Sequence, residues 1–134
     1  MIDTGDTGFM MSCSALVLLM TPGLAFFYGG MVRRKNVVNT MMTSIFVIGI
    51  ATVMWVLFGY SLAFGVDHLG IIGDLSHLGL VGLTGKVGEY ASTIPDLGFA
   101  MFQMMFAIIT PALITGAVAG RMKFKALFLF IIFW

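Results

Sequence analysis

Residues 97–120 read LGFAMFQMMFAIITPALITGAVAG and carry no charged side chain. An α-helix needs about 20 consecutive apolar residues to cross the hydrocarbon core of a bilayer, and this stretch is longer than that. Backbone N–H and C=O groups inside a bilayer must be paired within the protein, which a helix achieves along its own length. The stretch therefore predicts a transmembrane helix.

One face of this predicted helix is aromatic near its start and small near its end. At about 3.6 residues per turn, the residues that share this face are Phe99, Phe102, Phe106, Leu113, Gly116 and Gly120. Gln103 lies beside them, and its amide would be costly in hydrocarbon without a hydrogen-bond partner. We therefore expect the face to meet protein or a pore rather than lipid. The pattern also fits tight packing between spans, in which aromatic and Gly-xxx-Gly surfaces are common.

The composition of the whole chain is that of an integral membrane protein. Of its 134 residues, 60% are hydrophobic and 10% are charged, whereas soluble domains contain about 25% charged residues. The mean hydropathy is +1.06. At roughly 20 to 25 residues per helix, the chain has room for about four spans and no soluble domain. We predict an all-α polytopic membrane protein.

The uncharged stretches predict three complete spans and the start of a fourth. The complete spans cover about residues 9–32, 37–64 and 97–120, and the fourth covers 124–134. The apolar part of the last stretch would form only roughly 13 Å of helix, which is too short to cross a bilayer. The sequence thus has the pattern of the front part of a longer polytopic protein. Pro22 and Gly23 lie inside the first span and predict a kink there.

The distribution of charge predicts the orientation in the cell membrane. Two basic clusters follow the first and third spans: Arg33 to Lys35, and Arg121, Lys123 and Lys125. Because basic loops are retained in the cytoplasm, both clusters are expected there and the N-terminus outside. Residues 65–96 would then form a folded outer loop, in which Asp67, Asp74 and Glu89 outnumber Lys86.

Four motifs lie in register with these spans. They are PGLAFFYGG at 22–30, RKNV at 34–37, FGYSLAFG at 58–65 and FQMMFAIIT at 102–110. In order and spacing, over the whole chain, they resemble the ammonium transporter family. The resemblance implies an eleven-helix subunit, a homotrimer, a narrow pore through each subunit and an N-terminus outside the cell. The basic clusters predict the same orientation independently.

The resemblance also implies roles for particular residues. Phe106 would be the outer of two stacked phenylalanines that gate the pore, and Phe102 would border an outer recruitment vestibule. Residues along the conduction path would be Leu24, Phe27, Tyr28 and Leu113. The resemblance also implies that the family's paired pore histidines lie on later helices; His68 and His77 fall in the predicted outer loop and are not that pair. Gly120 departs from the family, which usually has a carboxylate at this position.

The chemistry expected of such a path suits ammonium. Aromatic faces attract a cation by roughly 0.5 to 2 kcal/mol, which favours recruitment at the vestibule. A charge at the centre of a bilayer costs about 2.5 to more than 10 kcal/mol, so a narrow apolar lumen favours deprotonation before ammonia is conducted. We predict no cofactor and no nucleic-acid partner. By resemblance, a PII-type signal protein would bind at the cytoplasmic face.

Two other interpretations have support in the sequence. Met101 and Met105 share a helical face and could bind Cu(I) through their thioethers, as in a copper transporter. Alternatively, Gly116-xxx-Gly120 and the glycine pairs could serve a membrane anchor or assembly subunit that transports nothing. An enzyme is the least supported class, because no span carries a nucleophile with a base, a phosphate-binding glycine loop or a cluster of metal ligands.

Overall fold

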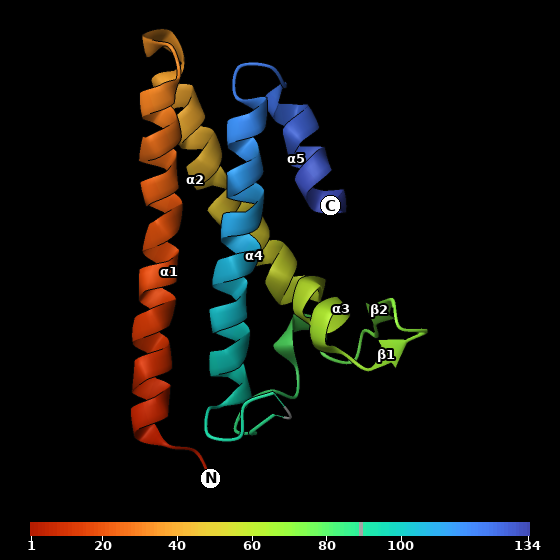
Figure 1. Ribbon diagram of the computed structural model, residues 1–134. Helices are drawn as coiled ribbons and strands as arrows, with labels where there is room; N and C mark the ends of the chain where they lie inside the picture. Colours follow the sequence, from red (N-terminus) through yellow and green to blue (C-terminus); the bar gives the residue numbers. More distant parts are fainter. Residues whose placement is uncertain (89) are drawn as a thin grey trace.

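A computed structural model of the protein describes residues 1–88 and 90–134, so Glu89 of the predicted outer loop lies outside the described residues. The chain folds into three long apolar helical segments and a short fourth, with a small two-stranded hairpin beside them (Figure 1). Three helical segments are long and apolar enough to cross a membrane: Thr4–Met31, Arg34–Phe64 and Asp96–Val118. The number and type of long helices therefore agree with the prediction.

The first span is one continuous helix, α1 (Thr4–Met31). It begins five residues before the predicted start because Asp3 caps it, with Oδ1 accepting from the N–H groups of Gly5 and Asp6 at 2.7 and 3.0 Å. The kink predicted at Pro22 does not interrupt the helix. Proline removes one N–H from the ladder, and the backbone bonds before and after it keep the remaining turns helical.

The second span contains a change of helix type. It starts with a 3₁₀ turn, η1 (Arg34–Asn36), continues as α2 (Val37–Met54), becomes a π-helix in η2 (Trp55–Gly59) and ends as α3 (Tyr60–Phe64). The indole N–H of Trp55 donates to the carbonyl of Ala100 in the third span at 3.1 Å. An ideal Cβ built on Gly59 would lie 3.3 Å from Cε3 of the Trp55 ring. The π-turn therefore leaves little room for a side chain at position 59 beside this indole.

The loop between the second and third spans begins with strands β1 (Asp67–His68) and β2 (Ile72–Gly73), which pair antiparallel. A 3₁₀ turn, η3 (Leu78–Leu80), follows. Asp74 links the hairpin to the end of the second span by hydrogen bonds. Its Oδ1 accepts from the Val66 N–H and the Ser76 hydroxyl, and its main-chain carbonyl accepts from the Ser61 hydroxyl at 2.8 Å. The hydrogen bond from the Ser76 hydroxyl is the largest cause of a lowered Asp74 pKa.

The three spans pack as a bundle in which α2 runs antiparallel to α1 and α4 (Asp96–Val118) (Figure 1). The core is mostly apolar and contains Val47, Ala51, Met105, Ile108, Ala112, Leu127 and Ile131. Within it, the hydroxyls of Ser44 and Thr115 lie 2.9 Å apart, which links α2 to α4. The short helix α5 (Phe124–Phe133) returns beside α2 and contributes the last two core residues.

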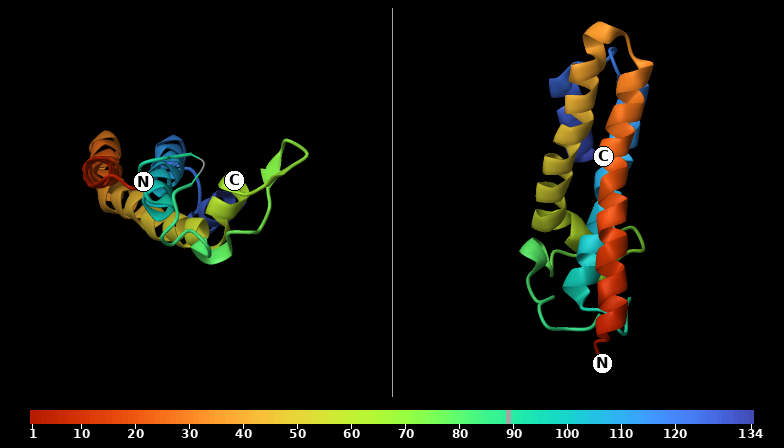
Figure 2. Two further views of the ribbon diagram at one scale, coloured as in Figure 1. Left: turned by 90° about the horizontal axis from the view of Figure 1, so that it is seen from below. Right: turned by 90° about the vertical axis from the view of Figure 1, so that its left-hand side faces the viewer.

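The ends of the bundle differ in charge. The N-terminus and the loop after α3 share one end, where the Asp3 N–H donates to the Thr93 carbonyl at 2.8 Å (Figures 1 and 2). The turns between α1 and α2 and between α4 and α5 share the other end, which we call the basic end because it carries both basic clusters. This arrangement is the one that the charge pattern predicted for a chain crossing three times.

Candidate functional site

Two residues of the predicted stripe of α4, Phe106 and Leu113, lie on the side of the helix that faces away from the core. Met105, Ile108, Ala112 and Thr115 occupy the buried side. Phe106 and Leu113, on the opposite side, keep exposed fractions of 42% and 49%. Because these two residues are seven positions apart, they lie on one stripe about 10 Å apart along the helix axis. The middle of the stripe is thus open, whereas Phe99 at one end packs on Phe64 and Gly116 at the other lies against the Tyr28 ring of α1.

Phe102 and Phe106 form an aromatic pair on this face. Their ring centroids lie 5.1 Å apart with an interplanar angle of 78°, an edge-to-face contact. The Thr110 hydroxyl donates to the Phe106 carbonyl at 2.7 Å, so it is satisfied locally within the helix. The spacing of the pair, one helical turn, follows from the sequence, and the recruitment and gate roles of these residues stay predictions.

Phe106 also lines an open groove of about 690 Å³ between α4 and the second span. Gln103 and Thr110 are its polar members on α4, and the second span contributes Trp55 and Phe58. The groove is therefore apolar with a few polar groups beside the Phe106 ring, which is the character of many small-molecule sites. The sequence analysis missed Trp55 and Phe58, because the π-turn that positions them leaves no signal in the hydropathy pattern.

The remaining predicted residues form a second group nearer the basic end. The Tyr28 hydroxyl donates to the Leu113 carbonyl at 2.9 Å, and the Tyr28 ring lies against Gly116. The rings of Phe27 and Tyr28 are 5.7 Å apart. These contacts bring together Phe27, Tyr28 and Leu113 from α1 and α4. Leu24 is different, because it is partly buried against the main core.

The structure thus separates the six predicted residues into an aromatic pair on α4, a group between α1 and α4 that contains Phe27, Tyr28 and Leu113, and Leu24 against the core. Phe102 and Phe106 lie toward the N-terminal end, and the group around Tyr28 lies toward the basic end. Tyr28 has a structural role that its motif did not show: it spans α1 and α4 by a hydrogen bond between residues 85 positions apart. The sequence signal for this contact is Gly116, because the absence of a side chain there leaves room for the Tyr28 ring.

The copper interpretation is not supported by the position of the methionines. Met105 has an exposed fraction of 6% and belongs to the apolar core, while Met101 lies largely exposed. Two thioethers that share a Cu(I) ion would have to face one open site. Among the described residues, no group of three or more His, Cys, Asp or Glu side chains is arranged to hold a metal ion.

Comparison with known proteins identifies the family. The model of the Ammonium Transporter Family matches residues 8–134. The chain belongs to the ammonium transporter family. This confirms the resemblance carried by the four motifs, and it places the chain in a family of transporters rather than enzymes.

Relatives in this family match the chain over nearly its whole length. It is 54% identical over 130 residues to an ammonium transporter of Bacillus subtilis, covering 97% of this chain and 32% of the relative. It is 42% identical to ammonium transporter Amt1 of Archaeoglobus fulgidus, covering 97% of this chain and 31% of the relative. The chain therefore spans about a third of the length of these relatives.

Solved structures show the same arrangement of helices. The crystal structure of Candida albicans Mep2 superposes with a TM-score of 0.88 at 28% identity, over 99% of this chain and 29% of that one. Saccharomyces cerevisiae Mep2 gives a TM-score of 0.87 at 30% identity, over 99% and 31%. The predicted fold class, three long apolar helices and a short fourth from a larger transporter fold, is confirmed.

Proposed function

We propose that this chain forms one wall of an ammonium-conducting pore in the full-length transporter, with the exposed stripe of α4 facing the pathway. The observation that carries the proposal is that Phe106 and Leu113 lie on the open side of α4, away from the core that α4 forms with α2 and α5. The match to the ammonium transporter family supports ammonium as the substrate.

The geometry suggests how the wall acts. The Phe102–Phe106 pair presents aromatic surface at one end of the stripe, where it attracts a cation by cation–π interaction without replacing the cation's full hydration. Beyond it, Phe27 and Leu113 offer only hydrocarbon, and the Tyr28 hydroxyl is already engaged by the Leu113 carbonyl. A path of this kind disfavours the ion and favours neutral ammonia, so deprotonation precedes conduction.

The experiment is a set of substitutions in the full-length protein with ammonium uptake as the assay. We expect Phe106→Ala to alter or abolish uptake while the protein still inserts, and Phe102→Ala to act more mildly through capture. Phe46→Ala is a matched control, because Phe46 pairs with Phe124 at the same centroid distance, 5.1 Å, on another surface. Wild-type rate and selectivity in both stripe variants would show that the stripe is a packing surface.

We also propose that the basic end is cytoplasmic and that the N-terminus lies outside the cell. The two basic clusters support this orientation because they share one end of the bundle. Single cysteines at Ser76 and Lys123, in a background without Cys13, test it with a membrane-impermeant label applied from outside. We expect labelling at position 76 only, and labelling at 123 alone would reverse the orientation.

By family resemblance we further propose that the full-length transporter is a homotrimer and that a PII-type signal protein binds its cytoplasmic face. The basic turns after α1 and α4 would form part of that face. Size-exclusion chromatography with light scattering on the purified full-length protein tests the oligomeric state, and a pull-down with a purified PII-type protein tests the partner.

A further inference from the structure

An open apolar groove follows the seam between α2 and α5. Two adjoining hollows form it, with volumes of about 370 and 510 Å³, and Phe46 of α2 and Phe128 of α5 line both of them. The other described residues along the groove are apolar or glycine, except Lys125 at one end. It meets the groove between α4 and the second span only at Met54 and Ile132. The two grooves are therefore separate surfaces over most of their length.

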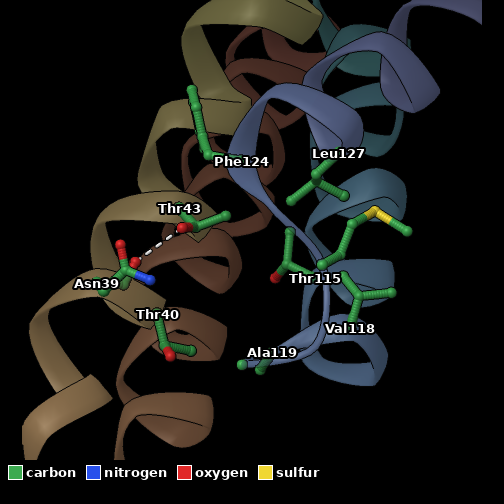
Figure 3. Close-up of a pocket in the computed structure, with 10 residues that line it drawn as sticks. Asn39, Thr40, Thr43, Thr115, Val118, Ala119, Phe124 and Leu127 are labelled. Carbon is green, nitrogen blue, oxygen red and sulfur yellow. Dashed lines mark hydrogen bonds between the residues drawn. The ribbon is translucent and has the colours of Figure 1, made fainter.

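The walls of this groove follow the period of a helix. Phe46 and Val53 lie seven positions apart on α2, and Phe128 and Ile132 lie four positions apart on α5, so each pair lies along one side of its helix. Near the basic end the walls touch, because the rings of Phe124 and Phe46 meet edge to face with centroids 5.1 Å apart. In Figure 3, Phe124 reaches from the start of α5 toward α2, at the rim of a small inner cavity. This aromatic contact holds the two walls together.

The groove lies within the part of the bundle that crosses the membrane. Its α2 wall belongs to the apolar segment Arg34–Phe64, which is long enough to span a bilayer. Phe46 and Val53 are half exposed, and a Cβ added to Gly49 between them would meet nothing within 4 Å. Inside a bilayer such a space is filled by hydrocarbon, because its walls offer water no partner and an empty space forfeits dispersion contacts.

A positive charge marks one end of the groove. Lys125 lies in the first turn of α5 (Phe124–Phe133) and is exposed. Because Cα–Cβ bonds tilt toward the N-terminus of a helix, its side chain leans toward the basic end. A lysine in such a place lays its methylene groups on apolar surface and keeps its ammonium at the level of the lipid headgroups. The hydrocarbon groove thus ends at an ammonium group near the membrane surface.

The surroundings of Lys125 are also positive. The turns that precede α2 and α5 meet at Asn36, whose Nδ2 would lie 3.6 Å from a Cβ on Gly120, so the two basic clusters form one surface. The aspartates of the described residues lie at the opposite end, in the N-terminal segment, the loop after α3 and the first turn of α4 (Figure 1). None of them neutralises this surface, whose other cations are Arg33, Arg34, Lys35, Arg121 and Lys123.

We propose that this groove is a binding site for an anionic phospholipid, with an acyl chain along the groove and the headgroup phosphate beside Lys125. A transmembrane helix in the same place would bury Lys125 and would have to bring a carboxylate to it. A phospholipid instead supplies hydrocarbon and a phosphate at the two depths where the groove needs them. A net negative headgroup is favoured, because each nearby basic residue strengthens its binding by about fivefold.

The test is photo-crosslinking of the full-length protein, in detergent micelles, with phosphatidylglycerol that carries a photoreactive acyl chain. We expect crosslinks within residues 45–54 and 124–132, mapped by mass spectrometry after proteolysis. Unlabelled phosphatidylglycerol should suppress them at a concentration about fivefold or more below that of phosphatidylcholine with the same chains. If both segments stay free of crosslinks, another part of the protein covers the groove. Equal competition by the two lipids would show that charge is not recognised, and either result overturns the proposal.

Variants of the full-length protein separate the two parts of the site. Lys125→Gln should reduce the preference for phosphatidylglycerol by about fivefold, while a photoreactive phosphatidylcholine still reaches the groove. Gly49→Leu fills the open space and should reduce crosslinking by either lipid. Lys86→Gln is the matched control, because Lys86 lies in the loop at the opposite end, and it should change nothing. An unchanged preference in Lys125→Gln would overturn the assignment of the headgroup, and the wild-type competition decides the proposal even where a variant does not fold.

Discussion

Substitution of Gly116 by alanine tests the contact that joins α1 to α4. An ideal Cβ on Gly116 would lie 2.7 Å from Cε2 of Tyr28 and closer still to two other ring carbons. Because these are ring atoms between two packed helices, the Tyr28 ring must move, and its 2.9 Å hydrogen bond to the Leu113 carbonyl is then lost.

The magnitude follows from three effects on the free energy of unfolding. Overpacking costs about 1 to 3 kcal/mol, and loss of a hydrogen bond costs about 0.5 to 1.5 kcal/mol. Replacing a helical glycine by alanine returns about 0.5 to 1 kcal/mol. The expected net result is a destabilisation of about 2 kcal/mol.

The assay is reversible unfolding of the 134-residue chain in mixed micelles by titration with SDS, followed by tryptophan fluorescence. Gly49→Ala is the matched control: it lies inside α2, and an added Cβ there meets nothing within 4 Å, so it should be neutral or slightly stabilising. In a Tyr28→Ala background, Gly116→Ala should also cease to destabilise. If Gly116→Ala is as stable as Gly49→Ala with Tyr28 intact, the Tyr28 ring does not occupy the place described.

Substitutions at three other positions test separate features. Trp55→Phe removes the indole donor to the Ala100 carbonyl and should destabilise the chain by about 0.5 to 1.5 kcal/mol in the same SDS titration, followed by circular dichroism because the variant lacks a reporting tryptophan; an unchanged midpoint would mean that this bond contributes nothing. Gly120 has a φ of +71°, so Gly120→Ala should lower the free energy of unfolding by about 1 to 2 kcal/mol. Gly120→Asn should lower it less, because asparagine tolerates this conformation. Equal losses of stability in the two variants would argue against a left-handed conformation at this residue. The pKa of Asp74 is lowered mainly by the hydrogen bond from the Ser76 hydroxyl. The stability that the ionised Asp74 gives to the loop is therefore fully present above the unfolded-state pKa and is lost as the pH falls through the folded-state pKa. The protection factors of the Val66 and Ser76 amides against hydrogen exchange should therefore fall on acidification below the usual carboxyl range, and Asp74→Asn should abolish that pH dependence.

The sequence by itself determined the spans, their number and the family. Uncharged stretches of sufficient length define helices in a bilayer because no other open backbone structure pairs its own polar groups there. The periodicity of α4 also predicted that Phe106 and Leu113 share a face, since this follows from 3.6 residues per turn alone. Helix starts were less accurate: α1 begins at Thr4 because of a local cap by Asp3 that hydropathy does not register.

Only the tertiary structure decided how those helices meet. The hydrogen bonds from Trp55 to the Ala100 carbonyl and from Tyr28 to the Leu113 carbonyl join residues that are 45 and 85 positions apart on different helices. Hydropathy and periodicity describe one helix at a time and contain no term for its rotation against a neighbour. That rotation is set by close packing and by the pairing of buried polar groups, and both exist only once the helices have associated.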